Sequence, residues 1–261
     1  MDRDAYYKLS CTLQDVAKMP EISITVLVGT ERYFSAGADV TSAASAYPAP
    51  LTKSNQDGNG DPEGNHDQGR RGILNGFVSL NLDITKAFYS HPKILVTALN
   101  GPAVGLSAAL IAWSDFVYAT PHAFLLTPFS SLGLVAEGGA SIGFVQRMGI
   151  TKAKEALIMS KRISCEELVQ TGFVNKVFQG RNEDDHEGFL EQVLSEVEDR
   201  LGAHLNQDSL LEIKKLVQKP FEETIEAQGV REVTEGLSRW MSGAPQEEFR
   251  KLAAREKRHK L

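Results

Sequence analysis

Residues 93–113, KILVTALNGPAVGLSAALIAW, limit the fold more than any other part of the chain. The stretch opens with a short apolar run, which predicts a buried strand ending at the turn NGPAVG. A short helix of small residues follows directly, and two further strand-like runs, DFVYAT and FLLTP, are broken at Pro121. A chain that alternates strand and helix in this way is typical of an α/β domain.

The alternation begins before this stretch. Leu9, Leu13 and Val16 have helical spacing, and the run EISITVLVG alternates apolar and polar residues as a strand does. Residues 47–72 are rich in Pro, Gly, Asn and Asp and have almost no large apolar side chain, which predicts a mobile surface loop. A linker between domains is the alternative, but the alternation resumes with a predicted helix over residues 73–89.

Helices dominate the remainder of the chain. One is predicted near residues 152–159, and Ser164 is placed to open another as its N-cap. A third follows Asp185 and carries an apolar stripe made of Leu190, Val193, Leu194, Val197 and Leu201. The sequence therefore predicts an α/β core over residues 1–180 and a helical region over residues 181–261.

Composition excludes several classes of protein. The chain has 261 residues, of which 42% are hydrophobic and 24% are charged, so it can bury a sizeable core. A formal net charge of -6 gives no general electrostatic reason to bind nucleic acid or an acidic membrane surface. No apolar run reaches the roughly 18 to 20 residues of a membrane span, and no signal peptide is recognisable. We therefore expect a soluble intracellular protein.

Sites of several familiar kinds are not expected. Cys11 and Cys165 lie far apart and belong to no Cys-x-x-Cys pair, and the six histidines have no metal-ligand spacing. The run GLSAA is not a Gly-x-Ser-x-Gly nucleophile elbow because Ala109 stands where the last glycine is needed, so Ser107 is a poor candidate nucleophile. Glycine-rich phosphate-binding motifs are also absent from the sequence.

Two glycine-containing turns are better candidates. One turn, in RYFSAGADV, includes Gly37 and Ala38, and the other, in NGPAVGLSAAL, opens a helix at Gly105 and Leu106. Both present backbone N–H groups with no bulky side chain in front. If two such groups converge on one point they form an oxyanion hole, and a helix N-terminus adds a favourable dipole. Each turn taken alone is more typical of simple packing.

Three blocks, FSAGADV, ALNGPAVGLSAALIAWSDFVYAT and FSSLGLVAEGGAS, resemble the crotonase (enoyl-CoA hydratase/isomerase) superfamily in their order and spacing, over about residues 9–178. The resemblance implies an α/β fold built as a spiral of ββα turns, with a C-terminal helical region that forms a homotrimer or hexamer. It implies an acyl-CoA thioester substrate and no cofactor, because coenzyme A is part of the substrate. It also implies that the N–H groups of Ala38 and Leu106 form the oxyanion hole.

The carboxylates distinguish members of this superfamily. Its hydratases resemble one another in carrying two glutamates, at positions that Ala109 and Ser131 occupy here. Glu137 stands a few residues further on, as in the fungal peroxisomal Δ3,Δ2-enoyl-CoA isomerases. By the same resemblance, Asn81 would lie near this carboxylate as a polar helper. The alternative for Asn81 is a solvated helix residue.

The resemblance implies an isomerase that moves the double bond of 3-enoyl-CoA to give 2-trans-enoyl-CoA in β-oxidation of unsaturated fatty acids, with Glu137 as the proton shuttle. An apolar pocket of Leu132, Leu134, Val135 and Phe144 would raise the pKa of Glu137 by desolvation. The alternative for Glu137 is a carboxylate that stabilises the first turn of the following helix.

Two other functions remain open. A dienoyl-CoA isomerase would be expected to use additional carboxylates, for which Asp83 and Asp115 are candidates. A non-catalytic crotonase-fold protein that binds acyl-CoA or serves as an assembly or RNA-associated subunit is the alternative of a different class.

Each end of the sequence supports a prediction, one about location and one about substrate binding. The final residues, His259, Lys260 and Leu261, resemble a Ser-Lys-Leu type peroxisomal address, which predicts a peroxisomal matrix protein recognised by the import receptor. Family members normally have a β-hairpin ahead of the residues that match Met1, and it usually helps to hold coenzyme A. This sequence lacks it, either because the true start lies upstream or because this is a shortened form.

Overall fold

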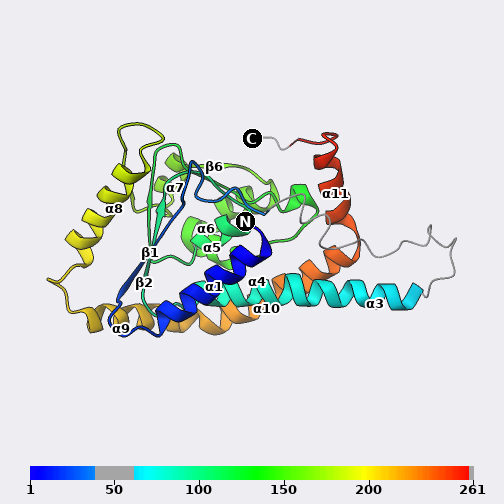
Figure 1. Cartoon of the computed structure of the whole chain (residues 1–261), viewed down its shortest axis with the longest axis horizontal. Coiled ribbons are helices and arrows are strands. Elements are labelled where there is room, and N and C mark those ends of the chain that lie inside the picture. The colour runs from blue at the N-terminus through cyan, green and yellow to red at the C-terminus, as the bar shows by residue number, and fades with distance from the viewer. Residues whose placement is uncertain (39–61, 259–261) are drawn as a thin grey trace.

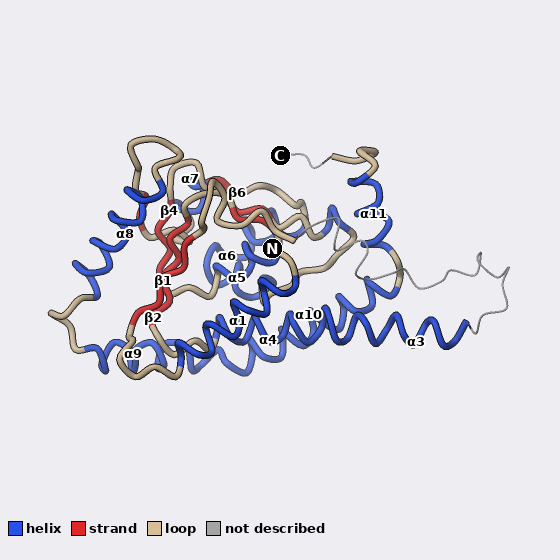
Figure 2. Tube along the Cα trace, in the orientation of Figure 1, coloured by secondary structure: helices blue, strands red, loops and turns tan. Residues whose placement is uncertain are grey.

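The computed structural model describes residues 1–38 and 62–258, and for residues 62–66 the backbone alone. It is a mixed α/β structure in which the strands cluster together and long helices run along one side of them (Figure 1, Figure 2). The helices in chain order are α1 (Arg3–Ala17), α3 (Pro62–Ile73), the π-helical η2 (Leu74–Val78), α4 (Ser79–Tyr89), α5 (Leu106–Ile111), η3 (Ser130–Leu132), α6 (Ala140–Ile158), α7 (Cys165–Gln170), α8 (His186–Leu201), α9 (Gln207–Gln218), η4 (Lys219–Phe221), α10 (Glu222–Met241) and α11 (Ala244–Ala253).

The strands form two sheets. The larger has the order β1-β2-β4-β7 and every neighbouring pair in it is parallel. The smaller has the order β3-β5-β6, in which β3 and β5 are parallel and β5 and β6 antiparallel. Their bounds are β1 (Ile24–Val28), β2 (Ile94–Leu99), β3 (Ala103–Val104), β4 (Phe116–Ala119), β5 (Phe124–Leu126), β6 (Ile163–Ser164) and β7 (Lys176–Val177).

Strand β2 is buried along its whole length because both faces of the larger sheet are covered. Ile94, Val96 and Ala98 belong to one hydrophobic cluster with the apolar stripe of α8. Leu95, on the opposite face, packs in a second cluster with residues of α1, α4 and α5. Since side chains alternate between the faces of a strand, this division explains why the run reads as continuously apolar.

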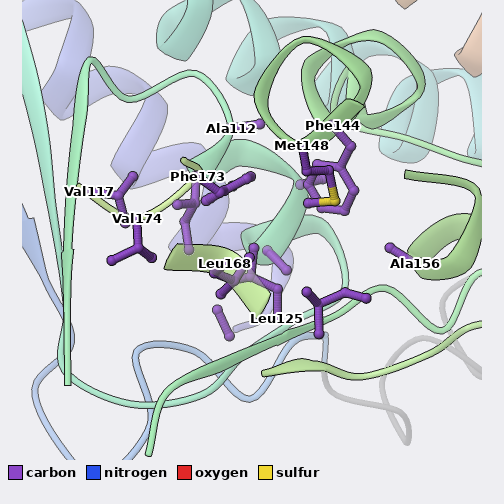
Figure 3. Packing of buried hydrophobic residues seen from close by; sticks show 14 of the residues in the cluster. Ala112, Val117, Leu125, Phe144, Met148, Ala156, Leu168, Phe173 and Val174 are labelled. Atoms are coloured by element: carbon purple, nitrogen blue, oxygen red, sulfur yellow. The ribbon is translucent and has the colours of Figure 1, made fainter. Parts of the chain in front are cut away.

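The largest cluster lies between the two sheets and helices α5, α6 and α7. Phe144 of α6 is fully buried there and meets Phe173 edge-on, with ring centroids 5.9 Å apart. Figure 3 shows Phe144 and Met148 pointing into this cluster together with Leu125 and Leu168. Small residues on α5 let α6 approach closely. A Cβ atom added at Gly143 would stand 3.0 Å from the Cβ of Ala112.

The structure confirms the predicted α/β fold class and most of its elements. The sequence pattern correctly predicted the positions of strands β1, β2, β4 and β5 and of helices α1, α5, α7 and α8. Strands β3, β6 and β7 were not predicted, since two residues are too few to show a period. Helix α6 starts well before residue 152 and passes Gly149, whose φ of 75° marks a kink.

The predicted mobile loop is wrong where the structure describes it. Helix α3 covers residues 62–73 and continues without interruption through η2 into α4. Pro62 is compatible with this because proline is tolerated in the first turn of a helix, where its missing N–H would have no partner. Residues 47–61 of the expected loop lie outside the described residues.

Within the described ranges, no helix is both long and apolar enough to span a bilayer.

A buried ion pair attaches α9 to the larger sheet. Lys214 Nζ donates to Asp115 Oδ2 at 2.6 Å and to the carbonyl oxygen of Lys93 at 2.7 Å. The Leu95 N–H donates to the same carboxylate oxygen at 2.7 Å. The Lys214 side chain is only 4% exposed and that of Asp115 18%, so neither charge has much water as an alternative partner.

We expect Lys214→Met to lower the free energy of unfolding by about 3 kcal/mol, because it removes the buried cation that pairs with the partly buried Asp115 carboxylate. Denaturant titration measures this loss. Lys215→Met is the matched control, since the Lys215 side chain is 72% exposed, and it should change stability by less than about 0.5 kcal/mol. Equal effects of the two substitutions would contradict this role of the pair.

Candidate active site

Glu137 lies in the connection between η3 and α6, three residues before the helix begins. The next two residues, Gly138 and Gly139, have φ angles of 69° and 74°, which side-chain-bearing residues rarely adopt. Gly139 is also the N-cap of α6, and as a glycine it supplies no side-chain cap. The backbone of Glu137 is therefore fixed by a tight left-handed turn at the helix N-terminus.

Helix α5 and Trp113, two residues after its end, leave no room for side chains at this turn. A Cβ atom at Gly138 would lie 2.7 Å from Leu106 Cδ1, and one at Gly139 would lie 2.4 Å from Trp113 Cζ2. Trp113 Nε1 also donates to the Gly138 carbonyl oxygen at 2.8 Å. These contacts place the turn that carries Glu137 directly against the helix that begins with Leu106.

Asn81 of α4 holds Glu137 from another side. Its Nδ2 donates to Glu137 Oε2 at 3.1 Å, and its Oδ1 accepts from the Gly138 N–H at 3.2 Å. Asn81 is buried, with 4% of its surface exposed, so it is not the solvated helix residue that was the alternative. The amide both orients the carboxylate and ties it to the turn.

Burial of the Glu137 carboxylate raises its pKa to about 8. Loss of water is the largest cause, and the nearby Glu232 carboxylate raises the pKa further. The Asn81 hydrogen bond acts in the opposite direction because it stabilises the ionised form. A carboxyl group with this pKa can act as a base or as an acid near neutral pH.

The two glycine-containing turns lie side by side. Ser35 forms a parallel bridge with Ala103: the Ser35 N–H donates to Pro102 O at 3.2 Å and the Val104 N–H to Ser35 O at 3.0 Å. The hydroxyl groups of Ser35 and Ser107 are 2.8 Å apart and buried. Tyr6 Oη completes this network, 2.8 Å from Ser107 Oγ.

These contacts bring Ala38, three residues after Ser35, close to the start of α5. Ala38 is exposed, and Leu106 is the first residue of its helix, so its N–H has no acceptor within that helix. Gly105, the N-cap, has a φ of 67°. The oxyanion hole that the family resemblance implies at the N–H groups of Ala38 and Leu106 stays a prediction.

The other acidic candidates are engaged in structural contacts. Asp83 accepts hydrogen bonds from Ser10 Oγ at 2.5 Å and Gln14 Nε2 at 3.1 Å, which join α4 to α1. Asp115 belongs to the Lys214 ion pair. Across residues 1–38 and 67–258, no group of three or more His, Cys, Asp or Glu side chains is arranged to hold a metal ion.

Sequence reasoning missed two residues beside Glu137. Glu232 comes from α10, and Tyr6 has its pKa raised to about 12 by burial and, to a smaller extent, by the Glu137 charge. Neither belongs to a motif, and both are distant from Glu137 in sequence. Of the apolar residues expected around Glu137, Leu132 and Phe144 belong to two different hydrophobic clusters.

Residues 75–241 match the protein family described as Enoyl-CoA hydratase/isomerase, and this match covers more than half of the chain. The chain belongs to this family. A Delta(3,5)-Delta(2,4)-dienoyl-CoA isomerase of Pyricularia oryzae is 55% identical over 264 residues, covering 100% of this chain and 91% of the relative. A 3,2-trans-enoyl-CoA isomerase of Saccharomyces cerevisiae is 30% identical over 263 residues, covering 100% and 89%.

Solved structures agree on the fold of this family. An enoyl-CoA hydratase/isomerase from Pseudoalteromonas atlantica matches with a TM-score of 0.76 at 21% identity, covering 100% of this chain and 90% of the other. This similarity confirms the crotonase-type fold that the three sequence blocks indicated.

We expect Gly139→Ala to destabilise the protein more than Gly149→Ala. Both glycines have left-handed φ angles, 74° and 75°, so each substitution costs about 1 to 2 kcal/mol from backbone strain. Only at Gly139 does the new methyl group meet Trp113, which adds about 1 to 3 kcal/mol, whereas nothing lies within 4 Å at Gly149. Urea unfolding of both variants measures the difference, and equal losses would show that the Trp113 contact does not support the turn.

Proposed function

We propose that this protein is an enoyl-CoA isomerase that converts 3-enoyl-CoA to 2-trans-enoyl-CoA, with Glu137 as the proton shuttle. The observation that carries the proposal is a single partly buried carboxylate of raised pKa, oriented by Asn81 at the turn beside Leu106. A relative named 3,2-trans-enoyl-CoA isomerase, 30% identical over the whole chain, supports the same reaction.

The reaction moves one proton and one double bond. The Glu137 carboxylate removes a proton from C2 of the substrate, and the electron pair left behind is delocalised into the thioester carbonyl and the C3–C4 double bond. The Glu137 carboxyl then returns the proton to C4. The double bond now lies between C2 and C3, and Glu137 is again ionised for the next turnover.

The dienolate oxygen formed in the first step needs hydrogen-bond donors. The proposed donors are the N–H groups of Ala38 and Leu106, on the two turns joined at Ser35 and Ala103. Each such donor typically contributes about 10² to 10³ in rate, and a positioned base about 10² to 10⁴.

Hydration of a double bond is the less suitable reaction for this site. It needs one group to activate water and another to protonate the substrate. Ala109 and Ser131 stand at the positions where the family's hydratases carry glutamates. A Cβ atom added at Gly138 would lie 3.0 Å from the Cβ of Ala109, so this part of the site is lined by a methyl group.

Dienoyl-CoA isomerisation is the second candidate, and the 55% identical Pyricularia oryzae relative named for that reaction favours it. There the proton must return at C6, which lies further from C2 than C4 does. Asp83 and Asp115 are bonded elsewhere, and both oxygens of the nearby Glu232 accept backbone N–H groups, so Glu137 would have to serve both positions. The single-carboxylate site therefore supports the shorter transfer better.

A non-catalytic role in acyl-CoA binding or assembly is less well supported. Such a protein has no need for a carboxylate held in an environment that raises its pKa to about 8.

We further propose that the protein is a homotrimer or hexamer of the peroxisomal matrix, imported through His259-Lys260-Leu261. These three residues lie outside the described part of the chain, and their sequence alone supports import.

We expect Glu137→Gln to reduce turnover of 3-enoyl-CoA by about 10² to 10⁴ because the amide cannot accept the C2 proton. The assay should compare 3-enoyl-CoA with 3,5-dienoyl-CoA for the unsubstituted protein and the variant. Glu235→Gln, on the exposed side of α10, is the control and should keep full activity. Retention of most activity by Glu137→Gln would refute the proposal, and a much higher kcat/KM for the dienoyl substrate would favour the second candidate.

The pH dependence of kcat/KM should follow the ionisation of the Glu137 carboxyl. It must be ionised in the free enzyme to accept a proton, so kcat/KM should rise with pH and level off above about 8. Asn81→Ala should move this limb to higher pH, because it removes the hydrogen bond that stabilises the ionised form. Asn75→Ala, at an exposed position in η2, should leave it unchanged. A limb centred near the ordinary value of 4.5 would contradict the assignment.

A further inference from the structure

Glu232 reaches from α10 to the turn that carries Glu137. Its Oε2 accepts from the Gly139 N–H at 2.7 Å and its Oε1 from the Ser141 N–H at 2.8 Å. The side chain is buried, with 5% of the residue exposed. Both oxygens are therefore used by backbone donors at the beginning of α6, and the carboxylate has little contact with solvent.

This contact replaces a local helix cap. Gly139 is the N-cap of α6 and has no side chain with which to satisfy the first N–H groups of that helix. Glu232 supplies the acceptors from a position 93 residues later in the sequence. Together with Asn81, which bonds the Gly138 N–H, it fixes consecutive backbone groups of the turn from two different helices.

The two carboxylates on this turn have different surroundings. Glu232 accepts two backbone N–H groups at a helix N-terminus, and both features favour its ionised form and oppose the rise in its pKa that burial causes. Glu137 accepts one bond from a neutral amide. A negative charge at Glu232 therefore makes a second negative charge at Glu137 unfavourable.

The remaining neighbours do not offset this repulsion. Among the described residues, Tyr6 on α1 is the other titratable group that interacts with Glu137, and it is neutral at physiological pH. Asn81 from α4 and Trp113, just after α5, are uncharged. On the Glu232 side, Gln228 Nε2 donates to Ser141 Oγ at 2.8 Å, which adds another neutral group.

We propose that Glu232 is a positioning residue for the reaction: it holds the Gly138–Gly139 turn in place and, as a buried anion, makes the ionised Glu137 carboxylate a stronger base for the C2 proton. The inference rests on the proposed function in taking Glu137 as the acid/base group. Helix α10 thereby becomes part of the active site, although Glu232 itself does not touch the substrate.

The test is the titration of the Glu137 carboxyl, followed by ¹³C NMR in protein labelled at glutamate carboxyl carbons. Glu232→Gln keeps the size of the side chain but removes its charge, and it should lower the apparent pKa of Glu137 by about 1 unit or more. The acid limb of kcat/KM should move to lower pH by the same amount. Glu235→Gln removes a charge from the exposed side of the same helix and should shift neither.

A purely structural role makes a different prediction. Loss of the cap alone would lower kcat across the whole pH range without moving the limb, and that result would overturn the proposal. If Glu232→Gln does not fold, the order of the two titrations in the unsubstituted protein is the second test. The Glu232 carboxyl should lose its proton at lower pH than the Glu137 carboxyl, and the reverse order would overturn the proposal.

Failure of this inference is distinguishable from failure of the proposed function. If the Glu137 titration is unshifted in Glu232→Gln but Glu137→Gln is inactive, the proposed role of Glu232 is wrong and the proposed function stands. If Glu137→Gln is active, the proposed function is wrong, whatever the titration shows.

Discussion

A carboxylate with little access to water must be held by protein groups, and the candidate active site is organised around this requirement at Glu137. Asn81 donates to it from α4, and the following turn packs against Trp113, two residues after the end of α5. Glu232 binds the same turn from α10. Contacts from three separate segments of the chain therefore converge on two glycines, which are small enough to admit them.

Much of the core could be predicted because its signals are local. The apolar run of β2 and the small residues of α5 follow from the need to bury both faces of a parallel sheet. Glu137 stood out as the candidate catalytic carboxylate by its position in the third block and by the lack of acids at Ala109 and Ser131. The hydrogen bond from Asn81 agrees with the placement that the family resemblance implied.

Other features could not be predicted because they depend on tertiary contacts. Glu232 lies in an amphipathic helix and has no local feature that distinguishes it from the exposed Glu235. Its role appears only when α10 is placed against the start of α6. Helix α3 was missed because its composition is typical of a loop, and it forms as the N-terminal extension of η2 and α4.

The chemistry of the family depends on where its carboxylates stand, since one fold can support several reactions. A single carboxylate beside the proposed oxyanion hole would suit transfer of a proton between C2 and C4, which are close on one face of the acyl chain. The most direct measurement is a single turnover of 3-enoyl-CoA carrying deuterium at C2, in ordinary water. If Glu137 performs both steps, a substantial share of the product will carry that deuterium at C4. If every new hydrogen at C4 comes from solvent, the single-carboxylate account is contradicted.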